Sequence, residues 1–442
     1  MTLSVTERVQ HALDRLEQVS GLNALAHPMK GEALGRAEML DETGPQDGQA
    51  LFGVPVVIKG NIAVAGQPFD GGSPALEGCI ASEDASAVAR LRQAGAVVVG
   101  ITNLHELAFG ITSANAHFGP VASPADPTRM AGGSSGGTAA AVAAGCVPAG
   151  LGTDTGGSGR LPAAMCGCVG LRPTTGRYAS DGVLTLSDTV DTIAPFGADV
   201  EQVALLDAVL SGEADVQRPD DPAQLRIGVV GDPYWTGLSH EMEATGRDVL
   251  RQLEASGISL VPLEAPGVGE MTAQSGFPVV LHETRANWIA FAQDMKGQSL
   301  IEFAGNIASP DVRGLFEALS RGELPGPEVY EAATTTVLPA LRDRMKALFE
   351  GNRLDALISP TLVSTAPKLG NTEEITINGE AKPLFDAMTA RSLIASMAGL
   401  PAVSMPFGLG PDGMPFSVEL VGAAGADRHL LAVARILEGL TK

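Results

Sequence analysis

A long segment almost without charge is the feature that most constrains this chain. Between Ala131 and Gly176 the only charged residues are Asp154, Arg160 and Arg172, and the remainder is rich in glycine and alanine. Charged side chains are rarely buried, so a segment that largely lacks them is expected to lie in the interior. Its hydroxyl groups then need hydrogen-bond partners or a chemical task. The segment therefore predicts a buried core that also holds a candidate site.

Helical and strand patterns alternate along the chain. Apolar residues at helical spacing predict helices at 4–18, 84–94, 135–144, 160–165, 242–256, 328–349 and 428–437. Apolar runs predict strands at 54–58, 96–100, 148–153, 225–231, 258–263, 356–359, 401–406 and 416–421. This alternation indicates an α/β fold, a single three-layer α/β/α domain over residues 1–442 with a central mixed sheet. Residues 264–350 are rich in predicted helix and are expected to form a helical cap or insert within it.

The composition argues against several classes of partner. The formal net charge is −22, whereas nucleic acid and anionic membranes are bound chiefly through Lys and Arg. No run of about eighteen residues is apolar enough to span a bilayer. The amphipathic first residues lack the basic start and apolar stretch of a signal peptide. We expect a cytoplasmic protein, monomer or homodimer, that acts on a small molecule.

Cysteine and histidine do not form metal-binding patterns in this sequence. The four cysteines, Cys79, Cys146, Cys166 and Cys168, are too few for a disulfide framework and are expected to be small buried hydrophobic residues. The seven histidines are scattered without HxH or HxxxH spacing. The sequence therefore predicts neither a metal nor a cofactor.

Two serines that follow glycine pairs are candidate nucleophiles. Ser158 lies in TGGSG, residues 155–159, directly after a predicted strand, where open α/β sheets present ligands. The N–H groups of Gly156, Gly157 and Ser158 can converge on one oxygen, and each good donor of this kind contributes about 3 kcal/mol. Ser158 is the preferred nucleophile, although the motif alone is also typical of a structural turn.

The other serine, Ser134, lies in a G-x-S-x-G motif that is typical of α/β-hydrolase nucleophile elbows. An elbow requires a strand directly before it, but residues 123–131 contain two prolines and an aspartate. It also requires a downstream histidine, and no histidine here has a distinctive setting. A P-loop would need a lysine after its glycines, and none follows. Neither alternative is favoured.

A single lysine, Lys59, ends the apolar strand VPVVIK at residues 54–59. Such a lysine is often a strand-end residue whose charge reaches solvent. If it is buried instead, desolvation lowers its pKa from about 10.4 and lets it act as a neutral base. A serine nucleophile, a glycine-rich oxyanion hole and a lysine base together predict a hydrolase.

These segments resemble the amidase signature family. GGSSGGTAAAVAAG (132–145), GLGTDTGGSGRLPA (150–163) and the strand lysine occur in the family's order and at its spacing. The similarity is strong over residues 51–198, which would form the catalytic core segment. It resumes more loosely at 355–361 and 399–408.

The resemblance implies a Ser-cisSer-Lys mechanism. Ser158 would attack the carbonyl carbon, and Ser134, in a cis peptide with Gly133, would relay the proton to neutral Lys59. The N–H groups of the TGGS segment would form the oxyanion hole, and four further residues would hold the loop. The implied oxyanion-hole residues are Thr155, Gly156, Gly157 and Ser158, and the implied supporting residues are Ser135, Thr153, Asp154 and Arg160.

Two positions depart from the family's pattern. Gly60 replaces an aspartate that many members carry after the lysine. Because side chains alternate along a strand, that aspartate would point away from Lys59, so the base itself is not put in doubt. Gly159 replaces a residue that is usually β-branched, and it is expected to widen the pocket beside the nucleophile.

Residues 102–120 and 171–183 resemble the indoleacetamide and mandelamide hydrolase branch of the family. That branch implies a small aryl-acyl amide as substrate. Ala108, Phe109 and Ile111 would line the acyl pocket, although their apolar character is equally expected of core packing. Aryl acylamides and carbamates share the triad and stay open as alternative substrates. An amidotransferase subunit is a further alternative, which the acidic composition disfavours.

Overall fold

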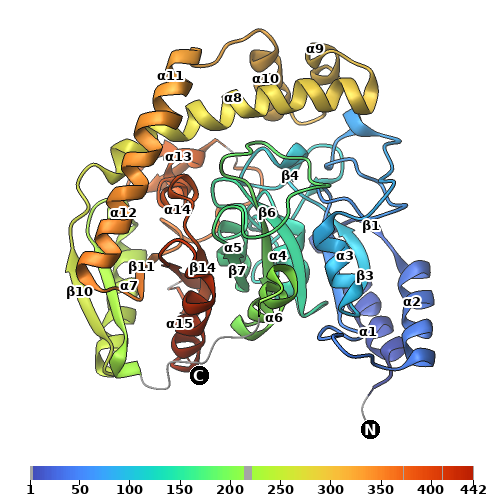
Figure 1. The fold of residues 1–442 in the computed structure, drawn as a ribbon, viewed down its shortest axis with the longest axis horizontal. Helices are drawn as coiled ribbons and strands as arrows, with labels where there is room; N and C mark the ends of the chain where they lie inside the picture. The colour runs from blue at the N-terminus through green and yellow to red at the C-terminus, as the bar shows by residue number, and fades with distance from the viewer. Residues whose placement is uncertain (1–2, 214–221, 372, 411, 442) are drawn as a thin grey trace.

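A sheet of 11 strands runs through the molecule and positions the other elements (Figure 1). The computed structural model describes residues 3–213, 222–371, 373–410 and 412–441. The strand order is β1 (Leu25–Pro28), β3 (Val97–Thr102), β2 (Pro55–Lys59), β6 (Ala149–Asp154), β8 (Thr192–Gly197), β7 (Val169–Arg172), β14 (Ala402–Leu409), β15 (Pro415–Val421), β11 (Ala356–Pro360), β9 (Arg226–Val230) and β10 (Ser259–Leu263).

The sheet is mixed, as the sequence predicts. β2 pairs in parallel with β3 and β6, and β9 pairs in parallel with β10 and β11. Antiparallel pairs connect these two regions through β8, β7, β14 and β15. Two small hairpin-like sheets, β4 (Ala114–Asn115) with β5 (Gly119–Pro120) and β12 (Glu374–Ile377) with β13 (Glu380–Pro383), lie outside it. The predicted α/β class is therefore confirmed.

Helices cover both faces of the sheet. They are α1 (Val5–Gln18), α2 (Lys30–Thr43), α3 (Ser86–Gln93), α4 (Gly136–Ala143), α5 (Leu161–Cys166), α6 (Val200–Ser211), α7 (His240–Ala255), α13 (Leu384–Thr389), α14 (Ser392–Ala398) and α15 (Asp427–Gly439). Alternate side chains of β2 point into two different apolar cores, one on each face of the sheet. Val56 and Ile58 belong to the cluster that includes α3 and α6, whereas Val57 belongs to the cluster that includes α1, α2 and α4. Since side chains alternate, Lys59 faces the same side as Val57, toward α4.

The small residues of α4 allow close packing near the site. Its sequence is GGTAAAVA, and every residue from Gly136 to Val142 is buried. Alanine combines a high helix propensity with a short side chain, so the helix forms readily and approaches β2 and β6 closely. The charge-poor segment is thus interior, and its three charged residues, Asp154, Arg160 and Arg172, are all 0% exposed.

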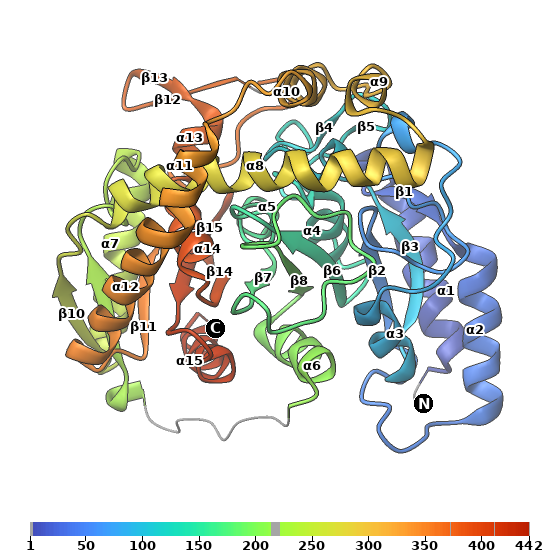
Figure 2. The same cartoon turned by 45° about the horizontal axis from the view of Figure 1, so that its top comes forward.

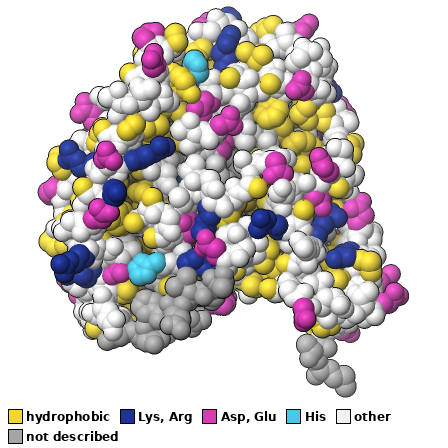
Figure 3. Space-filling view, viewed as in Figure 1, with side chains coloured by type: hydrophobic (Ala, Val, Ile, Leu, Met, Phe, Trp, Pro, Cys, Tyr) yellow, Lys and Arg dark blue, Asp and Glu magenta, His cyan; other side chains and the backbone are white. Residues whose placement is uncertain are grey.

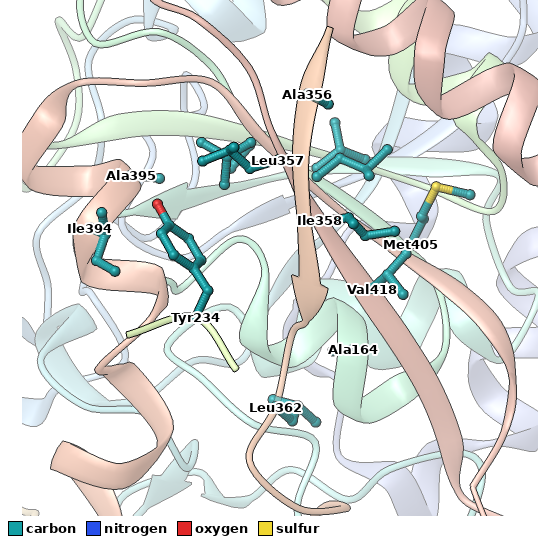
Figure 4. Packing of buried hydrophobic residues seen from close by; sticks show 14 of the residues in the cluster. Ala164, Tyr234, Ala356, Leu357, Ile358, Leu362, Ile394, Ala395, Met405 and Val418 are labelled. Atoms are coloured by element: carbon teal, nitrogen blue, oxygen red, sulfur yellow. The ribbon is translucent and has the colours of Figure 1, made fainter. Parts of the chain in front are cut away.

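The other half of the sheet has its own apolar core. Figure 4 shows Leu357 and Ile358 of β11 beside Met405 and Val418 from the neighbouring strands, with Ile394 of α14 nearby. Burial of each such side chain stabilises the fold by roughly 1.5–3 kcal/mol. α14, which contributes Ile394 to this core, contacts Asp154 at the end of β6 through Ser396.

Residues 268–352 are mainly helical, and their first part extends across one end of the sheet. The helices are α8 (Val268–Lys296), α9 (Leu300–Ala304), α10 (Pro310–Ser320), α11 (Pro327–Ala332) and α12 (Leu338–Asn352). Figures 1 and 2 both show the long α8 lying over the strands, with α9 and α10 beside it. Trp288 packs among apolar side chains of this layer and of residues 75–76, 107 and 184–186. We call residues 268–352 the cap.

The sequence pattern missed several elements and merged others. It did not predict β1, β7, β8, α2, α6, α13 or α14. The predicted helix at 328–349 is divided by a π-helical turn at Ala333–Val337, just before Pro339, which has no N–H to donate. The expectation that all four cysteines are buried is wrong for Cys79, which is only partly buried.

The surface carries mixed charges. Acidic and basic side chains are interspersed with apolar ones on the face in Figure 3, so on this face the net negative charge is spread over many elements. None of the helices in the described part of the chain is both long enough and apolar enough to cross a membrane.

Candidate active site

Lys59, at the end of β2, lies in the interior and contacts two hydroxyl groups. It is 0% exposed, and its Nζ donates to Ser134 Oγ at 2.8 Å and to Thr153 Oγ1 at 2.7 Å. Thr153 belongs to β6, the neighbouring strand, and Ser134 precedes α4. The structure therefore brings together Lys59 and Ser134, and places Thr153 in direct contact with the lysine.

Burial changes the acid–base character of Lys59. Desolvation lowers its pKa to about 7, although the charges of Asp191 and Asp154 oppose that shift. A lysine in this state is neutral in a large fraction of molecules near neutral pH, so its amine can accept a proton. Lys59 is therefore not a strand-end lysine whose charge reaches solvent, since its side chain is fully buried.

The backbone around Ser134 is fixed by several contacts. The Gly133–Ser134 peptide bond is cis. The carbonyl oxygen of Ser134 accepts from the N–H of His105 at 3.0 Å and from Ser113 Oγ at 3.4 Å. Ser135 Oγ donates to the Thr153 carbonyl at 3.2 Å and accepts from the Thr153 N–H at 3.3 Å. Ser135 thereby ties the serine segment to β6.

Ser158 lies just beyond the end of β6 and borders a cavity. It is 8% exposed, and its hydroxyl makes no hydrogen bond with another residue in the described ranges. Gly157 before it has φ +130°, and a Cβ there would lie 2.5 Å from Ser392 Oγ. Only glycine fits at this position.

Asp154 organises the loop that carries Ser158. Its carboxylate accepts from the N–H groups of Gly157 and Gly159, both at 3.0 Å, and from the guanidinium of Arg160. Burial disfavours the ionised carboxylate, but the charges of Arg160 and Arg172 outweigh burial and hold the pKa of Asp154 well below its usual range. Asp154 is therefore ionised at neutral pH and shapes the loop.

Two of the expected roles differ from what this geometry supports. The N–H of Gly157 donates to Asp154, so this donor is already engaged and does not point toward an oxyanion. Gly159 does not line the cavity: a Cβ there would lie 2.7 Å from Ala194 Cβ, on the inner side of the loop. Its small size serves loop packing instead of widening the pocket.

A buried cluster of ion pairs supports the loop that carries Ser158. Arg160 bonds Asp154 and Glu419 of β15, and Arg172 of β7 bonds Asp154 at 3.0 Å. Ser396 Oγ of α14 accepts from Arg160 at 2.9 Å. Breaking a buried pair by removing one partner typically costs 3–5 kcal/mol, because the other charge is left uncompensated. Sequence reasoning identified Asp154 and Arg160 but missed the partners on distant elements.

Asp191 is a second carboxylate near the lysine, and its side chain is partly buried. Its Oδ2 accepts from the N–H groups of Leu186 at 2.7 Å and Ser187 at 3.2 Å. Burial raises the pKa of Asp191 to about 6, against the opposing effects of Thr155, these N–H groups and Arg172. Asn61 Nδ2 donates to Thr153 Oγ1 at 3.3 Å and to the Leu184 carbonyl at 3.4 Å. Residues 184–191 thus border the site.

An apolar cavity opens onto Ser158. Its wall combines the loop after β3, the TGGS loop, the cap and α13–α14. The residues around it are Ala108, Phe109, Gly110, Ile111, Thr155, Gly156, Ser158, Leu186, Gly276, Phe277, Val280, Phe385, Thr389 and Leu393. Ala108, Phe109 and Ile111 lie on this wall, where the sequence places them, but the residues from Leu186 onward were missed because nothing local marks them.

The wall segment 106–111 is anchored to the cap. Leu107 and Ala108 have φ values of 53° and 61°, a conformation that costs roughly 1–2 kcal/mol per residue outside glycine. The buried carboxylate of Glu106 accepts from the N–H groups of Ala308 at 2.9 Å and Ser309 at 2.6 Å, and from Ser73 Oγ. These contacts hold the strained segment against the start of α10.

Comparison with known proteins identifies the family. A model of the Amidase family matches residues 7–431. The chain belongs to the amidase family. It is 38% identical to a mandelamide hydrolase from Pseudomonas putida over 98% of this chain and 87% of that protein. It is 35% identical to an indoleacetamide hydrolase from Agrobacterium vitis over 98% of this chain and 93% of that protein.

Solved structures agree with this assignment. A crystal structure of an amidase superposes on this amidase with a TM-score of 0.89 and 33% identity, covering 99% of this chain and 96% of that one. A bacterial aryl acylamidase of the amidase signature family superposes with a TM-score of 0.83 and 25% identity, covering 99% and 93%. The resemblance drawn from the motifs is confirmed: the protein is an amidase-family hydrolase that acts on amides.

Proposed function

We propose that this amidase hydrolyses small aryl-acyl amides through an acyl-enzyme intermediate on Ser158. The observation that carries the proposal is the apolar cavity at Ser158, together with a buried lysine that bonds Ser134 and also Thr153 of β6, the strand that leads to Ser158. Two similar proteins are named for mandelamide and indoleacetamide, both of which are aryl-acyl amides. The amino-acid chemistry and the relatives therefore support the same substrate class.

The proposed reaction has two half-reactions. Ser158 Oγ attacks the carbonyl carbon, and its proton passes through Ser134 Oγ to the neutral amine of Lys59. The same relay returns a proton to the leaving nitrogen, the C–N bond breaks, and ammonia or an amine departs while the acyl group stays on Ser158 as an ester. Water then attacks this ester with the relay as base, which releases the carboxylic acid and restores the serine.

Thr153 orients the base in this scheme. A neutral amine has two N–H donors and one lone pair, and Thr153 Oγ1 lies 2.7 Å from Nζ as an acceptor. The lone pair can then face Ser134 Oγ, which lies 2.8 Å from Nζ and becomes the donor. For the oxyanion hole we propose the N–H groups of Thr155, Gly156 and Ser158, since the N–H of Gly157 is held by Asp154.

The cavity wall favours a neutral aromatic acyl group. Of the described residues around it, Thr155, Ser158 and Thr389 carry polar side chains, and the rest are apolar or glycine. Phe277 of α8 and Phe385 of α13 lie at a ring-centroid distance of 5.8 Å, and Phe109 forms part of the inner wall. An aromatic ring would be desolvated there without leaving a charge unpaired.

The proposed substrate class can be tested by comparing phenylacetamide with a matched aryl carbamate. We expect kcat/KM for the amide to exceed that for the carbamate by at least about tenfold. Equal or faster cleavage of the carbamate would assign the alternative activity, which uses the same triad. Turnover of neither substrate, together with co-purification of a second protein, would favour an amidotransferase subunit.

The size of the acyl pocket should depend on Gly276 of α8. A Cβ at Gly276 has Leu393 Cδ2 as its nearest neighbour, at 4.0 Å, so Gly276→Ala adds a methyl group to the cavity without a clash. We expect kcat/KM for 2-naphthylacetamide to fall by about tenfold or more, while acetamide hydrolysis stays the same. Steady-state kinetics with both amides measure the effect.

Gly314→Ala is the matched control, because Gly314 lies in cap helix α10 with no atom within 4 Å of its Cβ position and outside the cavity. Both changes raise helix propensity, so neither should lower the melting temperature. An equal loss for both amides in Gly276→Ala would contradict the assignment of Gly276 to the acyl pocket.

A further inference from the structure

We propose that Glu283 of the cap helix α8 is a positioning residue that fixes the loop 184–191 and, through it, the acyl pocket. The carboxylate is 8% exposed, although it lies on a helix that covers the sheet. It touches no residue of the proposed triad. Its effect on the reaction would therefore be transmitted by the loop, and the proposal rests on the function proposed for Ser158.

Four donors converge on the Glu283 carboxylate. Oε2 accepts from Ser187 Oγ at 2.5 Å and from the N–H of Thr189 at 3.0 Å. Oε1 accepts from Thr189 Oγ1 at 2.5 Å and from the Tyr330 hydroxyl at 3.0 Å. Three of these donors belong to the loop and one to α11. Four donors on one carboxyl group fix its position on both oxygens, so Glu283 is a strong link between the loop and the cap.

The cap side of this link is itself fixed. Tyr330 stacks on His282 at a ring-centroid distance of 4.1 Å with an interplanar angle of 10°. Burial and the neighbouring carboxylate of Glu283 raise the pKa of Tyr330, so its hydroxyl keeps the proton that it donates. Glu283 therefore joins the loop to two cap helices, α8 and α11.

The loop touches the candidate site at two points, and it also carries Asp191, whose charge acts on Lys59. The side chain of Leu186 forms part of the cavity wall. The Leu184 carbonyl accepts from Asn61, which also donates to the Thr153 hydroxyl that binds Lys59. The N–H groups of Leu186 and Ser187 hold the Asp191 carboxylate. A displaced loop would move the pocket wall and would also change the surroundings of the base.

The Glu283 contact is distinct from the general support of the fold. The ion-pair cluster of Asp154 consists of residues of sheet strands, Arg160 at the start of α5 and Ser396 of α14. Glu283 instead joins the cap to the loop that carries Leu186, a residue of the cavity wall. Loss of this link should therefore impair substrates that contact Leu186 more than substrates too small to reach it.

The test compares Glu283→Ala with the parent on phenylacetamide and acetamide. We expect the ratio of kcat/KM for phenylacetamide to kcat/KM for acetamide to decrease by about tenfold to 100-fold. A misplaced cavity wall impairs the substrate that carries an aryl group. Glu270→Ala is the matched control, since Glu270 lies on the same helix, is exposed and bonds only Gln274 among the described contacts. It should leave the ratio unchanged.

Ser187→Ala is the second variant, and it removes only one of the four donors to Glu283. We expect it to fold even if Glu283→Ala does not. It should lower the same ratio in the same direction, and the double variant should lose less than the product of the two single effects. An equal loss for both amides, or an unchanged ratio in both variants, would overturn the role of Glu283. If Ser158→Ala retained activity, the proposed function would fail instead, so the two failures are distinguishable.

Discussion

Ser158→Ala is expected to lower kcat for amide hydrolysis by about 10⁵–10⁶-fold, since removal of a serine nucleophile abolishes the acyl-enzyme route. The side chain borders the cavity, and its hydroxyl is not engaged elsewhere in the described structure. Its replacement by a methyl group leaves the loop contacts of Asp154 in place. The melting temperature should therefore be unchanged while phenylacetamide turnover is lost.

Covalent labelling provides the control for this prediction. A fluorophosphonate should add to the parent protein at Ser158, as seen by mass spectrometry, and should not add to Ser158→Ala. Ser20→Ala, which alters an exposed serine near α1, should be labelled like the parent. A Ser158→Ala variant within tenfold of the parent, or one that is still labelled, would show that another residue is the nucleophile and make Ser134 the next candidate.

The sequence predicts the local part of this site well. Lys59 ends an apolar strand, and the two serine segments are short motifs whose geometry is set by neighbouring residues. The charge-poor segment correctly indicates burial, because few charged groups are available to hydrate it. The fold class follows from the alternation of helices and strands, since buried strands in an α/β sheet read as apolar runs.

Contacts between distant segments could not be predicted in the same way. Asp191 influences Lys59 because the topology places β8, which follows Asp191, beside β6. Glu419 pairs with Arg160 because α5, which follows Arg160, packs against β15. The sequence analysis expected the N–H of Gly157 in the oxyanion hole, but this N–H donates to Asp154. An N–H in a glycine loop can face either a ligand or a nearby carboxylate, and the sequence does not show which. Phe385 and Leu393 are ordinary helix residues until the fold places them beside the cavity.

The missed elements share a physical cause. The strand β8 begins with Thr192, ends with Gly197 and contains Pro195, so its sequence is not a regular apolar run. Helix α2 contains two glycines, Gly31 and Gly35, which weaken a helical prediction by about 1 kcal/mol each. Both elements are stabilised by packing against neighbours: Ala33 and Ala37 of α2 are buried in the same cluster as Phe196 of β8.

Lys59→Met is expected to lower kcat/KM by about 10³-fold or more, because the change removes the base but keeps a side chain of similar length. The exposed Lys346 of α12 provides the matched control: Lys346→Met should keep parental activity. A Lys59→Met protein with nearly full activity would contradict the role of the lysine, provided that its melting temperature matches that of the parent.

The pH dependence separates loss of a base from loss of packing. Desolvation lowers the pKa of Lys59 to about 7, so the amine is protonated and inactive as a base below this pH and neutral above it. The parent's kcat/KM should therefore rise as the pH increases toward 7 and level off at higher pH. Lys59→Met should lose this rise in its residual activity. A parental profile that is flat from pH 6 to 10 would mean that Lys59 does not titrate as the base, whatever its variant does to the rate.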